Sequence, residues 1–192
     1  MAIIFSINII YAKEKNMEMV IRKNIVKLGK YILLFALVIS SLAGCTPSDK
    51  ATVEKSLEIS LKNAEMIESK DSHGGFHGDG RFFCSLECPS DSVLNQIESN
   101  EHWHELPLSD NLNKLVIGET DGMTTYYPVF ADEDGNILFP QVENGYYFFK
   151  DRYDEAEDEY DDADVLNRGS YNFTFALYDS DNHKLYYCEI DT

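Results

Sequence analysis

Hydrophobic and polar residues alternate along much of the second half of the chain, with the two-residue period of half-buried β-strands. An earlier stretch, Arg81 to Cys88, shows the same pattern and ends at Pro89. Five later segments are expected to be strands: Thr125 to Phe130, Ile137 to Val142, Tyr146 to Arg152, Asn172 to Tyr178 and Lys184 to Ile190. Asp134-Gly135 and Asn144-Gly145 are typical hairpin turns between them.

Hydrophobic residues three and four positions apart precede these strands and predict helices. The longest such helix is capped by Asp49 or Thr52 and ends before Gly74-Gly75. Its one apolar face is formed by Val53, Leu57, Leu61, Ala64 and Ile67. Ser90 and Ser109 are expected to cap two short helices. The predicted fold is α+β: a single antiparallel sheet of about five or six strands packed on an N-terminal α-helix, with one or two short helices.

An apolar run from Tyr31 to Leu42 follows a cluster of basic residues and precedes the small residues Ala43 and Gly44. As a helix, residues 31–44 would extend only about 21 Å, whereas a bilayer core is about 30 Å thick. This layout favours a cleavable signal peptide over a permanent membrane-spanning helix.

The sequence Leu42-Ala43-Gly44-Cys45 resembles the lipobox of bacterial lipoproteins. The resemblance implies that residues 1–44 are removed as a signal peptide, with Met17 and Met19 as alternative starts. It also implies that the Cys45 sulfur carries a diacylglyceryl group, and that the lipid bilayer is the first partner of the protein. Two acyl chains satisfy the requirement for stable anchoring. The implied location is the bacterial cell membrane, facing outside the cytoplasm.

Removing residues 1–44 leaves 148 residues, enough for one domain with its own core. Cys45 to Ala51 would serve as lipidated cysteine and short linker, and residues 52–192 as a single acidic domain. From Cys45 onward the chain has 10 basic and 32 acidic residues, a net charge of −22. Such acidity excludes nucleic acid as a plausible partner.

The segment from Asp151 to Asp164 is the most acidic part of the chain, because nine of its fourteen residues are acidic. Mutual repulsion predicts a solvated loop. Three cysteines follow Cys45. Cys84 and Cys88 lie too far apart on a strand to pair with each other. Cys188 could pair with either of them, but we favour buried free thiols.

A metal site is one hypothesis for the glycine-rich segment of residues 71–80. Asp71, His73, His77 and Asp79 lie within these ten residues, and His102 and His104 could complete a nitrogen and oxygen shell for zinc or a similar divalent ion. The favoured alternative is structural: Gly74-Gly75 would form a helix C-cap, and Asp79-Gly80 a turn.

A calcium loop is a second metal hypothesis, because Asp132, Asp134, Asn136 and Glu143 match positions 1, 3, 5 and 12 of such a loop. Position 6 is Ile137 instead of glycine, so a hairpin turn at Asp134-Gly135 is the better interpretation.

No nucleophile elbow or recognised cysteine-protease sequence is found, and Cys84 with His77 is a weak candidate for a nucleophile and its base. The leading hypothesis is therefore a lipid-anchored, non-enzymatic protein that binds a protein, peptide or envelope component and requires no cofactor. The alternatives are a metal-binding surface protein using His73, His77 and Asp79, and a hydrolase of envelope material.

Overall fold

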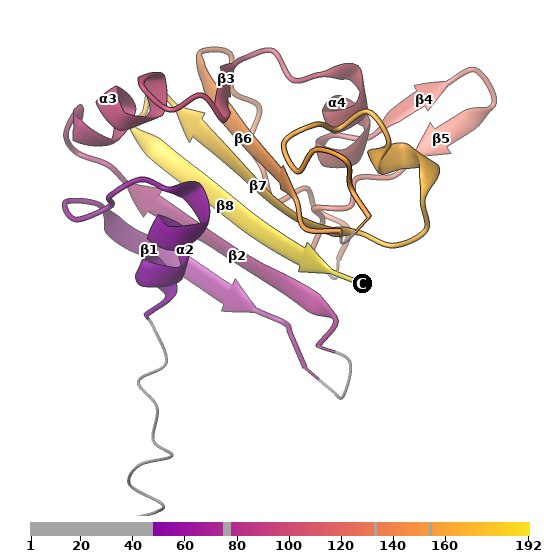
Figure 1. Cartoon of the computed structure of the whole chain (residues 1–192), viewed down its shortest axis with the longest axis horizontal. Coiled ribbons are helices and arrows are strands. Elements are labelled where there is room, and N and C mark those ends of the chain that lie inside the picture. Colours follow the sequence, from indigo (N-terminus) through magenta and orange to yellow (C-terminus); the bar gives the residue numbers. More distant parts are fainter. Residues whose placement is uncertain (1–47, 75–77, 133, 154) are drawn as a thin grey trace, which may run out of the picture. The chain divides into compact units, whose positions relative to one another are not determined.

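The computed structural model describes residues 48–74, 78–132, 134–153 and 155–192, and Cys45, the predicted signal peptide and His77 lie outside them. Within the described residues the fold is α+β, with three α-helices, one 3-10 helix, a six-stranded antiparallel sheet and a separate two-stranded hairpin (Figure 1). The predicted class is thus confirmed. In this part of the chain, no helix combines the length and the apolar character needed to cross a membrane.

The main sheet has the spatial order β1-β2-β8-β7-β6-β3, and each pair of neighbours is antiparallel. Its strands are β1 (Glu65–Asp71), β2 (Gly80–Glu87), β3 (Trp103–Glu105), β6 (Gly145–Asp151), β7 (Asn172–Asp179) and β8 (Lys184–Asp191). The hairpin consists of β4 (Glu119–Asp121) and β5 (Thr124–Tyr126). The helices are α2 (Asp49–Leu57), α3 (Ser92–Glu98), α4 (Asp110–Val116) and the 3-10 helix η1 (Val165–Asn167).

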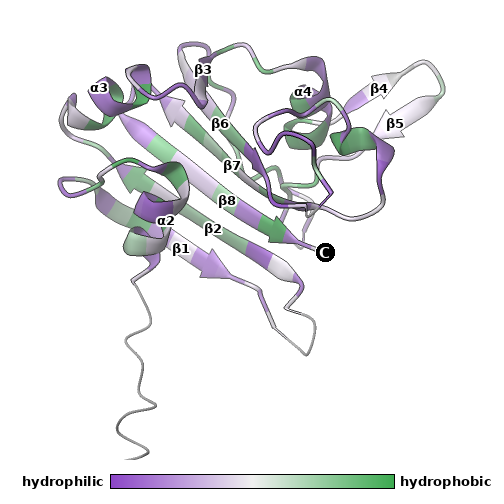
Figure 2. Cartoon of the chain, in the orientation of Figure 1, coloured by the Kyte–Doolittle hydropathy of each residue, from purple (hydrophilic) through white to green (hydrophobic). Residues whose placement is uncertain are grey.

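Both faces of the sheet contribute to a hydrophobic core. On one face, Leu86, Phe148 and Tyr187 share a buried cluster with residues of α2 and α3. On the other face, Phe83 and Phe175 share a second cluster with residues of α4 and with the aromatic residues of the segment that follows β5. Strand β7 lies between the two clusters, and all its residues except Asn172 are buried. Figure 2 shows hydrophobic and hydrophilic residues interspersed along the strands, and a mostly hydrophilic loop after β6.

The first helix is shorter than its hydrophobic spacing predicts. It begins after Ser48, whose hydroxyl accepts a hydrogen bond from the Ala51 N–H, and it ends at Leu57 because Glu58 adopts a left-handed conformation with φ 56°. Leu61 and Ala64 are still buried, but they lie in the connection to β1, which pairs with β2. The helix predicted to continue to Ile67 was therefore wrong, and His73 and Gly74 follow a strand instead of a helix C-terminus.

Gly145 does not form the predicted hairpin turn, because residues 137–142 form no strand. The β-pairing of these residues is limited to one isolated antiparallel bridge, between Ile137 and Ala131. Gly145 instead begins β6, at a point where β7 comes very close: a Cβ there would lie 1.9 Å from the carbonyl oxygen of Tyr178. Glycine is required for this close approach and not for a turn.

The turn predicted at Asp134-Gly135 is present. Gly135 has φ 84°, and the Asp132 carboxylate accepts hydrogen bonds from the backbone N–H groups of Asp134 and Asn136 at 3.0 and 2.8 Å. These contacts also lower the pKa of Asp132, mainly through the side-chain and backbone hydrogen bonds from Asn136. The resemblance to a calcium loop is thus explained by turn chemistry at Asp132.

The acidic segment is a loop, as predicted, and no helix or strand is found among its described residues from 152 to 164. Asp151, however, is not part of the solvated loop. It is the last residue of β6, is only 4% exposed and forms an ion pair with Arg168, with N–O distances of 2.6 and 2.7 Å. Within the loop, Asp162 accepts a hydrogen bond from Ser109, and its carbonyl accepts one from Asn111.

Candidate functional site

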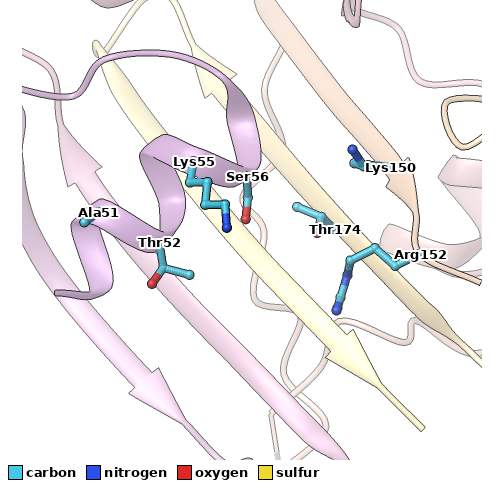
Figure 3. Close-up of a pocket in the computed structure, with 7 residues that line it drawn as sticks. All are labelled: Ala51, Thr52, Lys55, Ser56, Lys150, Arg152 and Thr174. Atoms are coloured by element: carbon cyan, nitrogen blue, oxygen red, sulfur yellow. The ribbon is translucent and has the colours of Figure 1, made fainter. Parts of the chain in front are cut away.

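A pocket of about 370 Å³ lies between α2 and the strands β6 and β7 (Figure 3). Seven residues line it: Ala51, Thr52, Lys55, Ser56, Lys150, Arg152 and Thr174. Its volume falls within the range that accommodates small ligands. Three of the ten basic residues after Cys45 meet here, although that part of the chain carries a net charge of −22. The pocket therefore brings together basic side chains that are scarce in the rest of this acidic domain.

Helix α2 supplies one wall of the pocket. Val53 and Leu57, four positions apart, are fully buried and fix which face of the helix turns inward. Lys55 and Ser56 consequently lie on a flank of α2, where Figure 3 shows them facing the strand residues across β8. The Ser56 hydroxyl donates a hydrogen bond to the Glu189 carboxylate of β8 at 3.1 Å.

Strands β6 and β7 supply the opposite wall. Lys150 and Thr174 are direct partners in the β6–β7 register, and Thr174 is in turn the partner of Glu189 in the β7–β8 register. Directly opposed residues of antiparallel strands share one face of the sheet, so these three side chains form a row on the face that includes the pocket. Arg152 follows β6, and its backbone N–H donates a hydrogen bond to the backbone carbonyl oxygen of Asn172 at 2.6 Å.

The charged groups of the pocket differ in how far they are already paired. The Arg152 guanidinium binds Asp191, with an Nη1–Oδ1 distance of 3.0 Å, and the Lys150 ammonium lies 3.1 Å from Glu159. Lys55 is exposed and belongs to no ion pair within the described part of the chain. Lys55 therefore provides the positive charge of the pocket that is not already neutralised by a neighbour.

Two further features of the strand side bear on ligand binding. Desolvation opposes the charge of Lys150, but hydrogen bonds to Tyr160 and Glu159 outweigh it, so the pKa of Lys150 is raised. Lys150 therefore remains cationic at neutral pH. The Nε–H of Arg152 is buried and has no hydrogen-bond partner among the described residues.

The predicted metal ligand His73 is held by two carboxylates. Its Nδ1 lies 2.7 Å from Asp71, and its Nε2 lies 3.1 Å from Asp191 of β8. A hydrogen bond from the backbone N–H of His73 also lowers the pKa of Asp71. Because Asp191 binds both His73 and Arg152, this contact joins the end of β1 to the pocket residues. Asp79 is described, but the side-chain hydrogen bonds and ion pairs of His73 are with Asp71 and Asp191.

His102 and His104 lie at the opposite edge of the sheet from His73. His102 stacks on Tyr160 with 3.6 Å between ring centroids, and His104 of β3 packs against Tyr147. Four strands separate β3 from β1, and neighbouring strands are about 4.8 Å apart, so these histidines cannot share an ion with His73. A smaller metal site near His73 stays a prediction.

A larger cavity of about 560 Å³ lies within the acidic loop, where Asp158, Asp161 and Asp164 are among the lining residues. Its lining also includes Asp151 and Arg168, which are paired with each other. Within residues 48–74, 78–132, 134–153 and 155–192, no group of three or more His, Cys, Asp or Glu side chains is arranged to hold a metal ion.

The three cysteines of the domain are buried free thiols. Cys84 and Cys188 lie on adjacent strands but belong to different core clusters on opposite faces of the sheet, so they do not face each other. Burial raises the pKa of Cys84 to about 12 and that of Cys88 to about 11, and it raises the pKa of Cys188 as well. Thiols with such pKa values are poor nucleophiles at neutral pH.

We expect none of these three thiols to react with a disulfide reagent at pH 8 in the native protein, because the thiolate form is scarce and access is blocked. Unfolding in urea without a reductant should release three reactive thiols if Cys45 is modified, and four if it is not. The measurement is the absorbance of the released chromophore. Fewer than three thiols after unfolding would indicate a disulfide and contradict the structure.

None of the pocket residues is predicted from the sequence as part of a site. Lys55 lies about one hundred positions from Lys150 and Arg152 in the chain, and each is an ordinary surface residue in its local pattern. The available signal was their scarcity, since basic residues in a strongly acidic chain are few enough to be examined one by one.

Comparison with known proteins does not assign the chain or its pocket to a family. No protein family, no curated protein and no solved structure matches the chain.

Proposed function

We propose that the chain is a lipid-anchored, non-enzymatic binding protein displayed outside the cytoplasmic membrane of a bacterium, with the pocket beside α2 as its binding site. The observation that carries the location is Leu42-Ala43-Gly44-Cys45, directly after an apolar run that is too short to span a bilayer. The partners in this proposal are the bilayer, through a diacylglyceryl group on Cys45, and a soluble or envelope ligand.

Two features support a binding role over catalysis. The pocket combines cationic and hydroxyl groups that orient a ligand. Cys84, which was the candidate nucleophile, is buried in the core with a raised pKa. A hydrolase of envelope material would require a different nucleophile.

The proposal includes the packing of the N-terminal helix on the sheet. Its support is the burial of Val53 and Leu57 in one cluster with Leu86 and Tyr187, together with the hydrogen bond from Ser56 to Glu189. This arrangement links the anchor to the pocket: only four residue steps, at most about 14 Å of extended chain, separate Cys45 from the start of α2 at Asp49.

The test is the intact mass of the protein purified from bacterial membranes. We expect a chain that begins at Cys45 and carries the added mass of a diacylglyceryl group, recovered in the detergent phase on phase partitioning. A Cys45→Ala variant should lack the added lipid mass. An unmodified chain that retains residues 1–44, or recovery of the native protein in the cytosolic fraction, would refute the proposal.

A further inference from the structure

We infer that the pocket between α2 and the strands β6 and β7 binds a phosphate-bearing anion. The inference rests on the proposed function, because it names the ligand class of the site proposed there. It starts from three cationic side chains that line one pocket, Lys55, Lys150 and Arg152, and from the hydroxyl groups of Thr52, Ser56 and Thr174 between them.

The arrangement of free donors favours phosphate over carboxylate. A planar carboxylate is best bound by the two-pronged face of an arginine, but Arg152 already uses both Nη atoms to bind Asp191, with distances of 3.0 and 3.2 Å. The donors that remain come mainly from the lysine ammonium groups, which act as point charges and are common phosphate ligands. Separate donors on opposite walls match the dispersed oxygens of a tetrahedral anion better than a planar one.

The carboxylates around the pocket are already engaged. Glu189 accepts hydrogen bonds from Ser56 and Tyr187, and Asp191 accepts them from Arg152 and His73. Glu159 pairs with Lys150 and Asp191 pairs with Arg152, and Glu189 adds a negative charge that only hydroxyl groups contact. The affinity for an anion should therefore depend chiefly on Lys55, the cation without an ion-pair partner in the described residues.

Position and volume indicate which phosphates are relevant. About 370 Å³ is more space than a single phosphate ion requires, which leaves room for an organic group attached to it. Residues 51–56 follow Cys45 closely, so a lipidated Cys45 would hold them near the phosphates of the membrane surface. The same chemistry is offered by lipid headgroups and by soluble phosphates, and the experiment must separate these two sources.

The experiment is calorimetric titration of the full-length protein, purified in detergent, with three probes: inorganic phosphate, the short-chain lipid dihexanoyl phosphatidylglycerol below its micelle concentration, and acetate. We expect saturable binding of at least one phosphate probe and no saturable binding of acetate. Tighter binding of the short-chain lipid would identify a headgroup as the source, and tighter binding of inorganic phosphate a soluble one.

Two variants determine where the anion binds. Lys55→Gln should weaken binding about tenfold or more, because it removes a charged hydrogen-bond donor. Lys62→Gln removes the same charge from another exposed position and should leave the affinity unchanged within about twofold. Both residues are exposed, so neither substitution should affect folding.

The inference would be overturned by three results: no saturable binding of either phosphate probe, acetate binding of equal strength, or equal losses in Lys55→Gln and Lys62→Gln. These outcomes are independent of the anchor. A lipidated protein that binds no phosphate refutes the ligand class alone, whereas phosphate binding by a protein with unmodified Cys45 refutes only the membrane location.

Discussion

Replacing Arg168 with methionine should destabilise the domain by about 3–5 kcal/mol, because it leaves a buried carboxylate without its counter-charge. Arg168 holds Asp151 through two hydrogen bonds, and the two side chains are only 14% and 4% exposed. Methionine keeps most of the length and apolar volume of the arginine stem, so the loss is mainly electrostatic. The measurement is the free energy of unfolding from urea denaturation.

The pair also closes the base of the acidic loop. Asp151 ends β6 and Arg168 follows η1, so their contact joins the two ends of a segment whose carboxylates repel one another. The Arg168 guanidinium lies over the ring of Tyr153 as well, 4.6 Å from its centroid. Loss of Arg168 should therefore release the loop in addition to weakening the end of β6.

Two comparisons make this prediction specific. Lys62→Met removes a positive charge at an exposed site and should change the free energy of unfolding by no more than about 0.5 kcal/mol. The double variant Asp151→Asn, Arg168→Met should be more stable than Arg168→Met alone, since no unpaired charge remains buried. A strictly additive loss in the double variant would show that the ion pair is not the cause.

The elements that the sequence predicts well are those in which local pattern and tertiary role agree. Strands β2, β6, β7 and β8 lie within one or two residues of their predicted bounds, because each alternates between the two buried faces of the sheet. Ser109 caps α4 as predicted, through a hydrogen bond from the Leu112 N–H to its hydroxyl. A capping side chain acts on its own neighbours, so the sequence carries much of the signal. The cap predicted at Ser90 was wrong, because the N-cap of α3 is Asp91 and no side chain of the described residues caps this helix.

The secondary-structure predictions are wrong where the local sequence is compatible with two structures and tertiary contacts select one of them. Leu57, Leu61 and Ala64 have helical spacing, yet the chain leaves the helix at Glu58 and forms β1, which hydrogen-bonds to the outer edge of β2. No local pattern shows that β2 needs this partner. Asn144-Gly145 is a typical hairpin-turn sequence. The glycine is required, however, because the backbone of Tyr178, which is distant in sequence, comes very close to it.

The pocket was unpredictable for a related reason. Its walls come from residues about one hundred positions apart, and they meet only because β6, β7 and β8 are neighbours in the sheet. The metal hypothesis used proximity in sequence instead, which correctly joined Asp71 to His73 but also grouped His73 with His102 and His104 from the opposite edge. The spacing of residues along the chain predicts a site only when all residues of the site belong to one helix, strand or loop.

Replacing Phe130 with alanine should destabilise the domain by about 3–5 kcal/mol, because it empties the centre of the second core cluster. Phe130 is fully buried, and its ring centroid lies 5.2–5.4 Å from those of Phe139, Phe173 and Phe175.

Phe130 also attaches a segment without regular strands to the sheet. Its carbonyl accepts a hydrogen bond from the Leu138 N–H at 2.8 Å, which closes the turn around Gly135. Phe130→Leu should recover part of the loss, since leucine refills some of the cavity. Tyr127→Ala provides the matched control: it removes an aromatic ring three positions away that is 80% exposed, and it should cost no more than about 0.5 kcal/mol. Equal effects of Phe130→Ala and Tyr127→Ala in urea denaturation would contradict the docking of this segment on the sheet, whereas a large difference would establish Phe130 as the residue that fixes it there.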